Sequence, residues 1–159
     1  FVKVRHELHA GGTLAIDEEH DIVYRELPRA GDAAPPAPPA PADADWTRVV
    51  EPDDVLLFRY SALTFNAHRI HYDRRYVTTV EGYPGLVVHG PLIATLLLDL
   101  LRREVPAAQV TRFAFKAVQP VFDTAPFQVC GRRLDAQHVA LWALTPEGQL
   151  AMDASATLA

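Results

Sequence analysis

Apolar residues predict one long buried helix in the middle of the chain. Residues 89–103 (HGPLIATLLLDLLRR) are apolar around almost the whole helical circumference, which is typical of a helix enclosed by its domain. Pro91 suits the first helical position, and Arg102 and Arg103 complement the negative end of the helix dipole. A membrane span needs about 20 apolar residues, whereas this run is shorter and contains Asp99. We therefore predict a core helix and no membrane contact.

Period-two alternation predicts β-strands through most of the remaining chain. The extended runs are residues 1–8, 14–16, 21–25 and 46–50 before the helix, and 110–118, 127–132, 139–144 and 150–158 after it. Gly11-Gly12 and residues 146–149 supply hairpin turns, and a turn or short helix is expected within 51–62. One buried helix followed by antiparallel strands predicts an α+β fold with the sheet curled around the helix.

A proline-rich segment divides the chain into three parts. Residues 28–45 are mostly proline and alanine, which predicts a solvated, extended spacer; a proline-recognition ligand is the alternative. Residues 1–27 form a strand hairpin without a core of its own, and residues 46–159 form the main domain. The chain begins with Phe1 inside a strand-like run, so we expect it to be a piece of a longer one.

Composition narrows the classes of function. A chain of 159 residues that is 49% hydrophobic can bury one substantial core. Its net charge of -5 argues against a nucleic-acid surface, which relies on clustered Lys and Arg. The single cysteine, Cys130, excludes an internal disulfide and favours a cytoplasmic location. Because Cys130 falls within a predicted strand, we interpret it as a packing residue rather than a nucleophile.

Candidate chemistry gathers just before the predicted helix. His68, His71 and His89 lie in residues 60–73 and 85–91, and histidine is the natural proton carrier near neutral pH. Each histidine taken alone is more often a packed or solvated residue than a catalyst. A zinc site made of the three is a further possibility, although no carboxylate or thiol partner is evident. His6 and His9 are interpreted as ordinary strand and turn residues.

These residues resemble the signature of the MaoC-like hydratases and dehydratases, the (R)-specific enoyl-thioester hydratase family with the hot-dog fold. The family motif is an aromatic residue and Ser, then Asp-x-Asn-Pro-aliphatic-His, and later an aliphatic pair with His-Gly at the start of the helix. Tyr60, Ser61, Ile70 and His71 match the first part, and residues 87–90 match the second. The resemblance covers roughly residues 46–159.

The sequence departs from the motif at three positions. Asn66, His68 and Arg69 stand where the family has Asp, Asn and Pro. This form is similar to a branch that includes mesaconyl-CoA hydratase-like proteins and mitochondrial-type hydroxyacyl-thioester dehydratases, in which two hot-dog repeats are often fused. Residues 1–27 resemble the end of such a preceding repeat. The resemblance therefore implies a homodimer, or a pseudo-dimer with a second hot-dog repeat.

The implied activity is the interconversion of enoyl and 3-hydroxyacyl thioesters, with coenzyme A or an acyl carrier as the thiol, without a metal or cofactor. His71 is the expected base, and Asn66, which cannot ionise, is expected to position the water. Gly90 at the helix start is expected to donate its N–H to the thioester oxygen.

Four further residues are expected to bind substrate: His68, Arg69, His89 and Tyr60. His68 and Arg69 suit a second carboxylate or the coenzyme A phosphates, or are solvated side chains, while His89 suits a cap, a core residue or a pocket wall. A mesaconyl-type branched dicarboxylic acyl group and short or long linear ones stay open. A hot-dog acyl-CoA thioesterase, and a non-catalytic half that pairs with an active subunit, are the alternative functions.

Overall fold

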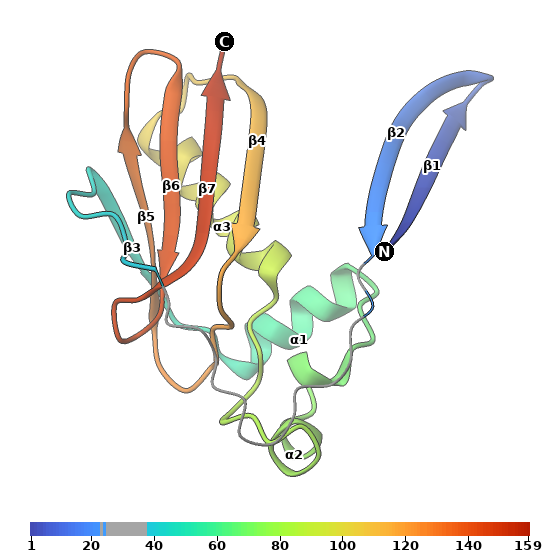
Figure 1. Ribbon diagram of the computed structural model, residues 1–159, viewed down its shortest axis with the longest axis vertical. Coiled ribbons are helices and arrows are strands. Elements are labelled where there is room, and N and C mark those ends of the chain that lie inside the picture. The colour runs from blue at the N-terminus through green and yellow to red at the C-terminus, as the bar shows by residue number, and fades with distance from the viewer. Residues whose placement is uncertain (23, 25–37) are drawn as a thin grey trace. The chain divides into compact units, whose positions relative to one another are not determined.

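The computed structural model describes residues 1–22, 24 and 38–159, and the chain divides into two compact units, Phe1–Pro35 and Pro36–Ala159 (Figure 1). The division falls inside the predicted spacer, of which residues 28–37 lie outside the described part of the chain. Each unit has its own secondary structure.

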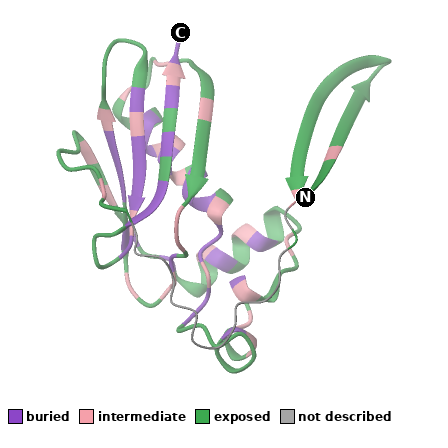
Figure 2. Ribbon diagram, in the orientation of Figure 1, coloured by how far each residue is buried: buried purple, intermediate pink, exposed green. Residues whose placement is uncertain are grey.

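The first unit is an antiparallel hairpin, as predicted. Strand β1 (Val2–Ala10) pairs with β2 (Thr13–Ile22), and the turn residues Gly11 and Gly12 adopt φ of +57° and +81°, a region that favours glycine. The predicted runs 14–16 and 21–25 belong, up to Ile22, to the single strand β2. Nearly all of the hairpin is exposed (Figure 2), which agrees with the absence of a core of its own.

The second unit is built on a five-stranded antiparallel sheet. Its strands are β3 (Trp46–Val50), β4 (Val110–Ala117), β5 (Phe127–Arg133), β6 (His138–Leu144) and β7 (Leu150–Leu158), in the order β3-β5-β6-β7-β4. Helix α3 (Gly90–Glu104) packs against β3, β5, β6 and β7 on one face of this sheet (Figure 1). The predicted α+β arrangement of a sheet around one helix is confirmed.

Short helices connect β3 to α3. Helix α1 (Asp54–Leu63) is capped by Asp53, whose side chain accepts the N–H of Leu56, and a single 3-10 turn, η1, covers Arg69–His71. Helix α2 (Arg74–Thr79) is capped in the same way by Asp73. The sequence pattern did not predict α2, because a helix of six residues with only Val77 buried has no visible apolar period.

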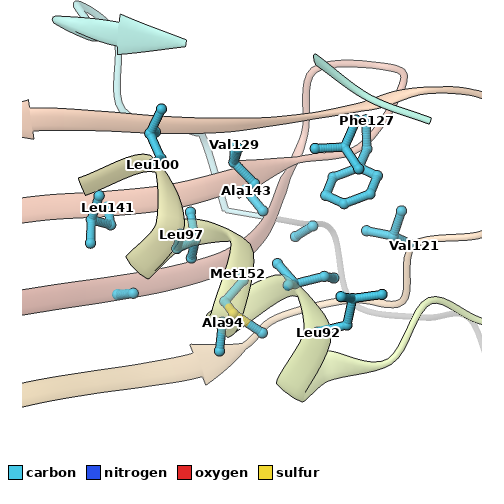
Figure 3. Packing of buried hydrophobic residues seen from close by; sticks show 14 of the residues in the cluster. Leu92, Ala94, Leu97, Leu100, Val121, Phe127, Val129, Leu141, Ala143 and Met152 are labelled. Carbon is cyan, nitrogen blue, oxygen red and sulfur yellow. The ribbon is translucent and has the colours of Figure 1, made fainter. Parts of the chain in front are cut away.

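The core lies between α3 and the sheet. Figure 3 shows leucines of α3 packed against strand residues. The labelled residues are Leu92, Ala94, Leu97, Leu100, Val121, Phe127, Val129, Leu141, Ala143 and Met152. The prediction that α3 is enclosed all round is wrong for this chain, because Pro91, Thr95 and Arg102 are exposed. The apolar residues Leu96 and Leu98 are only half-buried, although Leu96 packs against the core, so part of the apolar circumference of α3 is exposed.

A second, smaller cluster covers the outer face of the sheet. Cys130, Trp142 and Leu150 are buried there, and the half-buried Ala40 packs against them. The end of the predicted spacer therefore lies on the sheet, which corrects the expectation that the segment is wholly solvated. Burial raises the pKa of the Cys130 thiol, in keeping with its predicted packing role. Within the described residues, no helix has the length and apolar character to cross a membrane.

Leu97 gives a test of this core. It is fully buried, whereas Thr95 on the same helix is exposed. We expect Leu97→Ala to lower the free energy of unfolding by about 2–5 kcal/mol, since it leaves a cavity under the sheet. Thr95→Ala should change it by less than about 0.5 kcal/mol. Urea unfolding followed by circular dichroism measures both, and equal effects would contradict this packing.

Candidate active site

His71 is held by the backbone that leads into α3. It ends the η1 turn, and its side chain is buried, with 8% of the residue exposed. Its Nδ1 lies 2.7 Å from the carbonyl oxygen of Val87. Since a carbonyl oxygen only accepts, the proton of the neutral imidazole sits on Nδ1. Nε2 therefore keeps its lone pair, which is the state that a general base requires.

His89 lies directly against His71. The two rings are stacked, with centroids 3.8 Å apart and an interplanar angle of 17°. His89 occupies the N-cap position of α3 and is 1% exposed. Its Nε2 lies 2.8 Å from Oγ of Ser61, and the ring of Tyr60 contacts it edge-on at 4.8 Å. Its Nδ1 is buried without a hydrogen-bond partner among the described residues.

Burial keeps both imidazoles neutral. Desolvation and, to a smaller extent, the neighbouring His71 lower the pKa of His89 to about 4. Desolvation also lowers the pKa of His71, against the opposite effect of its hydrogen bond to Val87, while His68 lowers it. Two stacked rings cannot both carry a positive charge at this distance without strong repulsion. The stack can therefore take up one proton.

Asn66 lies at the end of the turn that follows α1. Its side-chain oxygen accepts the N–H of His68 at 3.0 Å, and its own N–H donates to the carbonyl of Ser61 at 2.9 Å. The preceding Phe65 has a φ of +53°, a left-handed conformation rare for aromatic residues. An apolar hollow of about 290 Å³ opens beside Asn66. It is lined by Phe58, Ser61, Ala62, Phe65, Asn66, Ala67 and Tyr72.

His68 and Arg69 are exposed beside this region. The His68 ring meets the His71 ring edge-on at 5.6 Å, so it lies on the outer side of the stack. The guanidinium of Arg69 pairs with Asp73 at 2.7 Å and lies 4.0 Å from the ring centre of Tyr76. Arg69 therefore already has a carboxylate partner, and an anionic ligand would have to share or replace it.

Gly90 lines a cavity of about 330 Å³ at the start of α3. The lining is mostly apolar and comes from the entry to α3, the end of β4 and the start of β7. A Cβ atom at Gly90 would meet only the Met152 methyl group, at 4.0 Å, so the backbone is open there. The first N–H groups of a helix lack intrahelical partners, and the dipole favours negative charge beside them. This position therefore suits a negatively charged oxygen atom, an oxyanion.

The predicted residues fall into two groups. Tyr60, His68, His71 and His89 are joined by ring contacts, and Asn66 is attached to them through His68. Gly90 directly follows His89, but its cavity and the hollow beside Asn66 are lined by different residues. The described residues contain no group of three or more His, Cys, Asp or Glu arranged to hold a metal ion.

Two partners in the site were not among the predicted site residues. The hydroxyl of Ser61 bonds His89, and the carbonyl of Val87 bonds His71. Ser61 had a signal, since it matches the motif serine. Val87 matches the aliphatic pair of the motif, but its bond to His71 could not be predicted, because a backbone carbonyl leaves no mark in the choice of side chain.

Known proteins match both the chain and its fold. A family model for hydroxyacyl-thioester dehydratase type 2 matches residues 1–123. Mesaconyl-C(4)-CoA hydratase of Chloroflexus aurantiacus is 46% identical over 158 residues, which are 99% of this chain and 56% of that protein. The solved (R)-hydratase from A. caviae involved in PHA biosynthesis superposes with a TM-score of 0.62 at 17% identity, covering 73% of this chain and 95% of that chain. A chain of the ChsH1-ChsH2 complex from Mycobacterium tuberculosis superposes with a TM-score of 0.61 at 14% identity, covering 71% and 91%.

The antiparallel sheet around one core helix defines a hot-dog domain. The chain belongs to the hydroxyacyl-thioester dehydratase type 2 family. The predicted fold and family are thus confirmed. The chain spans about half the length of the Chloroflexus aurantiacus protein, 56% of it.

The neutral stack makes stability depend on pH. A histidine whose folded pKa lies below its ordinary value of about 6.5 is protonated first in the unfolded chain, so its contribution is complete above that value and is lost as the pH falls. For His89, with a folded pKa of about 4, the expected loss between neutral pH and about pH 4 is on the order of 3 kcal/mol. His89→Asn should flatten this slope in urea unfolding at a series of pH values. Parallel curves for the two proteins would contradict a neutral His89.

Proposed function

We propose that this chain carries the active site of a hydro-lyase that interconverts enoyl and 3-hydroxyacyl thioesters. The observation that carries the proposal is His71, whose Nδ1 is committed to Val87 and whose Nε2 is left as a base, next to the start of α3. The cavity at Gly90 supplies an apolar slot beside a helix N-terminus. Family membership supports the same chemistry.

Residue chemistry assigns the steps of hydration. His71 Nε2 takes a proton from water, and the water oxygen bonds to the β-carbon of the enoyl thioester. The electron pair moves to the thioester oxygen, where the Gly90 N–H and the α3 dipole stabilise the negative charge. The proton held by His71 then goes to the α-carbon, so the addition of water balances without a second acid. Dehydration is the same path in reverse.

The remaining predicted residues take supporting roles in this proposal. The Asn66 amide donates to or accepts from the water but does not ionise, so it positions the nucleophile. His89 is 1% exposed, which favours support of the His71 ring over contact with substrate. Tyr60 packs on His89, and His68 and Arg69 are exposed where an acyl carboxylate or coenzyme A phosphates would arrive.

The named relative suggests the substrate. The Chloroflexus aurantiacus protein is a mesaconyl-C(4)-CoA hydratase, so a branched dicarboxylic acyl-CoA is the first substrate to test. The next substrates to test are thioesters of short and longer linear enoyl groups, and enoyl thioesters of an acyl carrier in place of coenzyme A. We also propose a cytoplasmic location, which the single cysteine supports.

A second hot-dog unit is the proposed partner, from another copy or from a fused repeat. The exposed side of α3, with Pro91, Thr95 and Arg102, supports this, as does the edge strand β4, which is exposed at Val110 and Phe115. The hairpin also presents apolar side chains without a core. One of the similar folds, in the ChsH1-ChsH2 complex, occurs as an assembly of two named components.

Substitution at the proposed base and its neighbour tests the activity. We expect His71→Ala to abolish hydration and Asn66→Ala to impair it severely, while Asn66→Asp keeps measurable activity because the family motif has a carboxylate there. The assay is loss of the enoyl-thioester ultraviolet absorbance with a panel of enoyl-CoA substrates. A thiol-trapping dye in parallel detects the rival thioesterase. Near wild-type hydration by both alanine variants would remove the catalytic assignment, and activity in none of the assays would favour a non-catalytic half.

Gly90 gives a separate test of the oxyanion position. A methyl group at Gly90 fits without a clash, since the nearest atom is 4.0 Å away, so Gly90→Ala should fold with unchanged stability. The same methyl group would fill the space where the thioester oxygen approaches the N–H. We expect kcat/KM to fall by at least about tenfold, a part of the about 2.7–4 kcal/mol that one oxyanion donor supplies. Full activity in a folded Gly90→Ala would place the substrate elsewhere.

A further inference from the structure

A buried carboxylate lies behind the segment that leads into α3. The side chain of Asp123 is 1% exposed, although the residue sits in the loop between β4 and β5. Its Oδ1 accepts the N–H of Leu86 at 2.8 Å, and its own N–H donates to the carbonyl of Leu86 at 3.0 Å. Asp123 therefore clamps Leu86 by two bonds in opposite directions.

Arg74 supplies the charge that this carboxylate needs. Its guanidinium contacts Asp123 through both terminal nitrogens, and one of these nitrogens also contacts Asp54 at the start of α1. Burying a carboxylate is costly unless it is paired and hydrogen-bonded, and Asp123 is both. The cation joins α2, the start of α1 and the loop after β4 in one contact.

Gly85 shows how closely this contact is packed. A Cβ atom at Gly85 would overlap Oδ1 of Asp123 and lie 3.0 Å from the methyl carbon of Thr124. Because the Asp123 carboxylate is held from two sides, it cannot move aside at little cost. Only glycine at position 85 leaves Asp123 in its place.

The segment that Asp123 clamps contains the carbonyl that orients His71. Val87 donates its N–H to Ile70 at 3.0 Å and accepts from His71 Nδ1 at 2.7 Å. Val88 donates to the carbonyl of Val121 at 2.8 Å. The segment thus bonds the loop after β4 on one side and the η1 turn on the other, and it runs directly into His89 and Gly90.

We propose that Arg74 and Asp123 are positioning residues for the reaction at His71 and Gly90. They fix residues 86–88, and through this segment they set both the tautomer of His71 and the place where α3 begins. Neither residue touches the proposed reacting atoms. The inference rests on the proposed function for its kinetic consequence, but its structural consequence, the tautomer of His71, stands apart from activity.

The structural consequence is measured by nitrogen NMR of the His71 imidazole in the full chain. The wild-type protein should give the shifts of one tautomer, protonated at Nδ1. Asp123→Ala, which removes the acceptor for the Leu86 N–H, should give a mixture of tautomers, and Asp123→Asn, which keeps an oxygen there, should restore most of the single state. Asp99→Ala is the matched control, since Asp99 pairs with Arg48 and Arg102 away from this segment. It should leave the tautomer unchanged.

Gly85→Ala tests the same inference with every charge retained. It replaces Asp123→Ala if that variant does not fold. It should perturb the tautomer by pushing the Asp123 carboxylate. On an active thioester we expect both variants to lower kcat by at least about tenfold with KM changed less than about threefold, because positioning acts in the transition state. A folded variant with the wild-type tautomer overturns the inference. An altered tautomer in a chain inactive on all thioesters upholds it, and the proposed function fails instead.

Discussion

The hydrogen bond between Nδ1 of His71 and the carbonyl of Val87 is the contact on which the rest of the site depends. A neutral imidazole carries one proton, and this bond decides which nitrogen holds it. The backbone that provides the carbonyl also begins α3, because Val87 is followed within three residues by the N-cap His89 and by Gly90. The proposed base and the proposed oxyanion position are therefore set by one piece of chain rather than by two independent loops.

The charge state of the stacked His89 also affects how His71 can take up a proton. A helix N-terminus disfavours positive charge. His89 occupies this position with a pKa of about 4, and its Nδ1 has no hydrogen-bond partner in the part of the chain that the structure describes. A neutral ring beside His71 provides packing without a second charge, so a proton taken from water meets no competing imidazolium.

The hydrophobic pattern predicted the long helix and the strands, because a regular period repeats several times along each of them. The predicted helix 89–103 corresponds to Gly90–Glu104, and each predicted strand after it exists. The extent of burial was harder to predict, since Leu97 and Leu98 are equally apolar but differ in burial according to which side meets the sheet.

The crowding of histidines indicated the candidate site, but the pairing of Arg74 with Asp123 could not be predicted. These residues are far apart in the chain, and neither spacing nor residue type distinguishes them from the other charged residues of the sequence.

In the proposed mechanism, an amide at Asn66 gives His71 a different electrostatic setting from the carboxylate of the family motif. A carboxylate near a histidine raises the pKa of the ring by stabilising its charged form. An amide leaves the pKa of His71 where burial puts it, below the ordinary value, so the ring is in its basic form at neutral pH. The imidazolium that the proposed proton uptake would form then lacks the stabilising charge of a neighbouring carboxylate. The backbone carbonyl of Val87, which accepts from Nδ1 in both states, is the group that remains to stabilise it, and this makes the position of that carbonyl more important than in a site with a carboxylate.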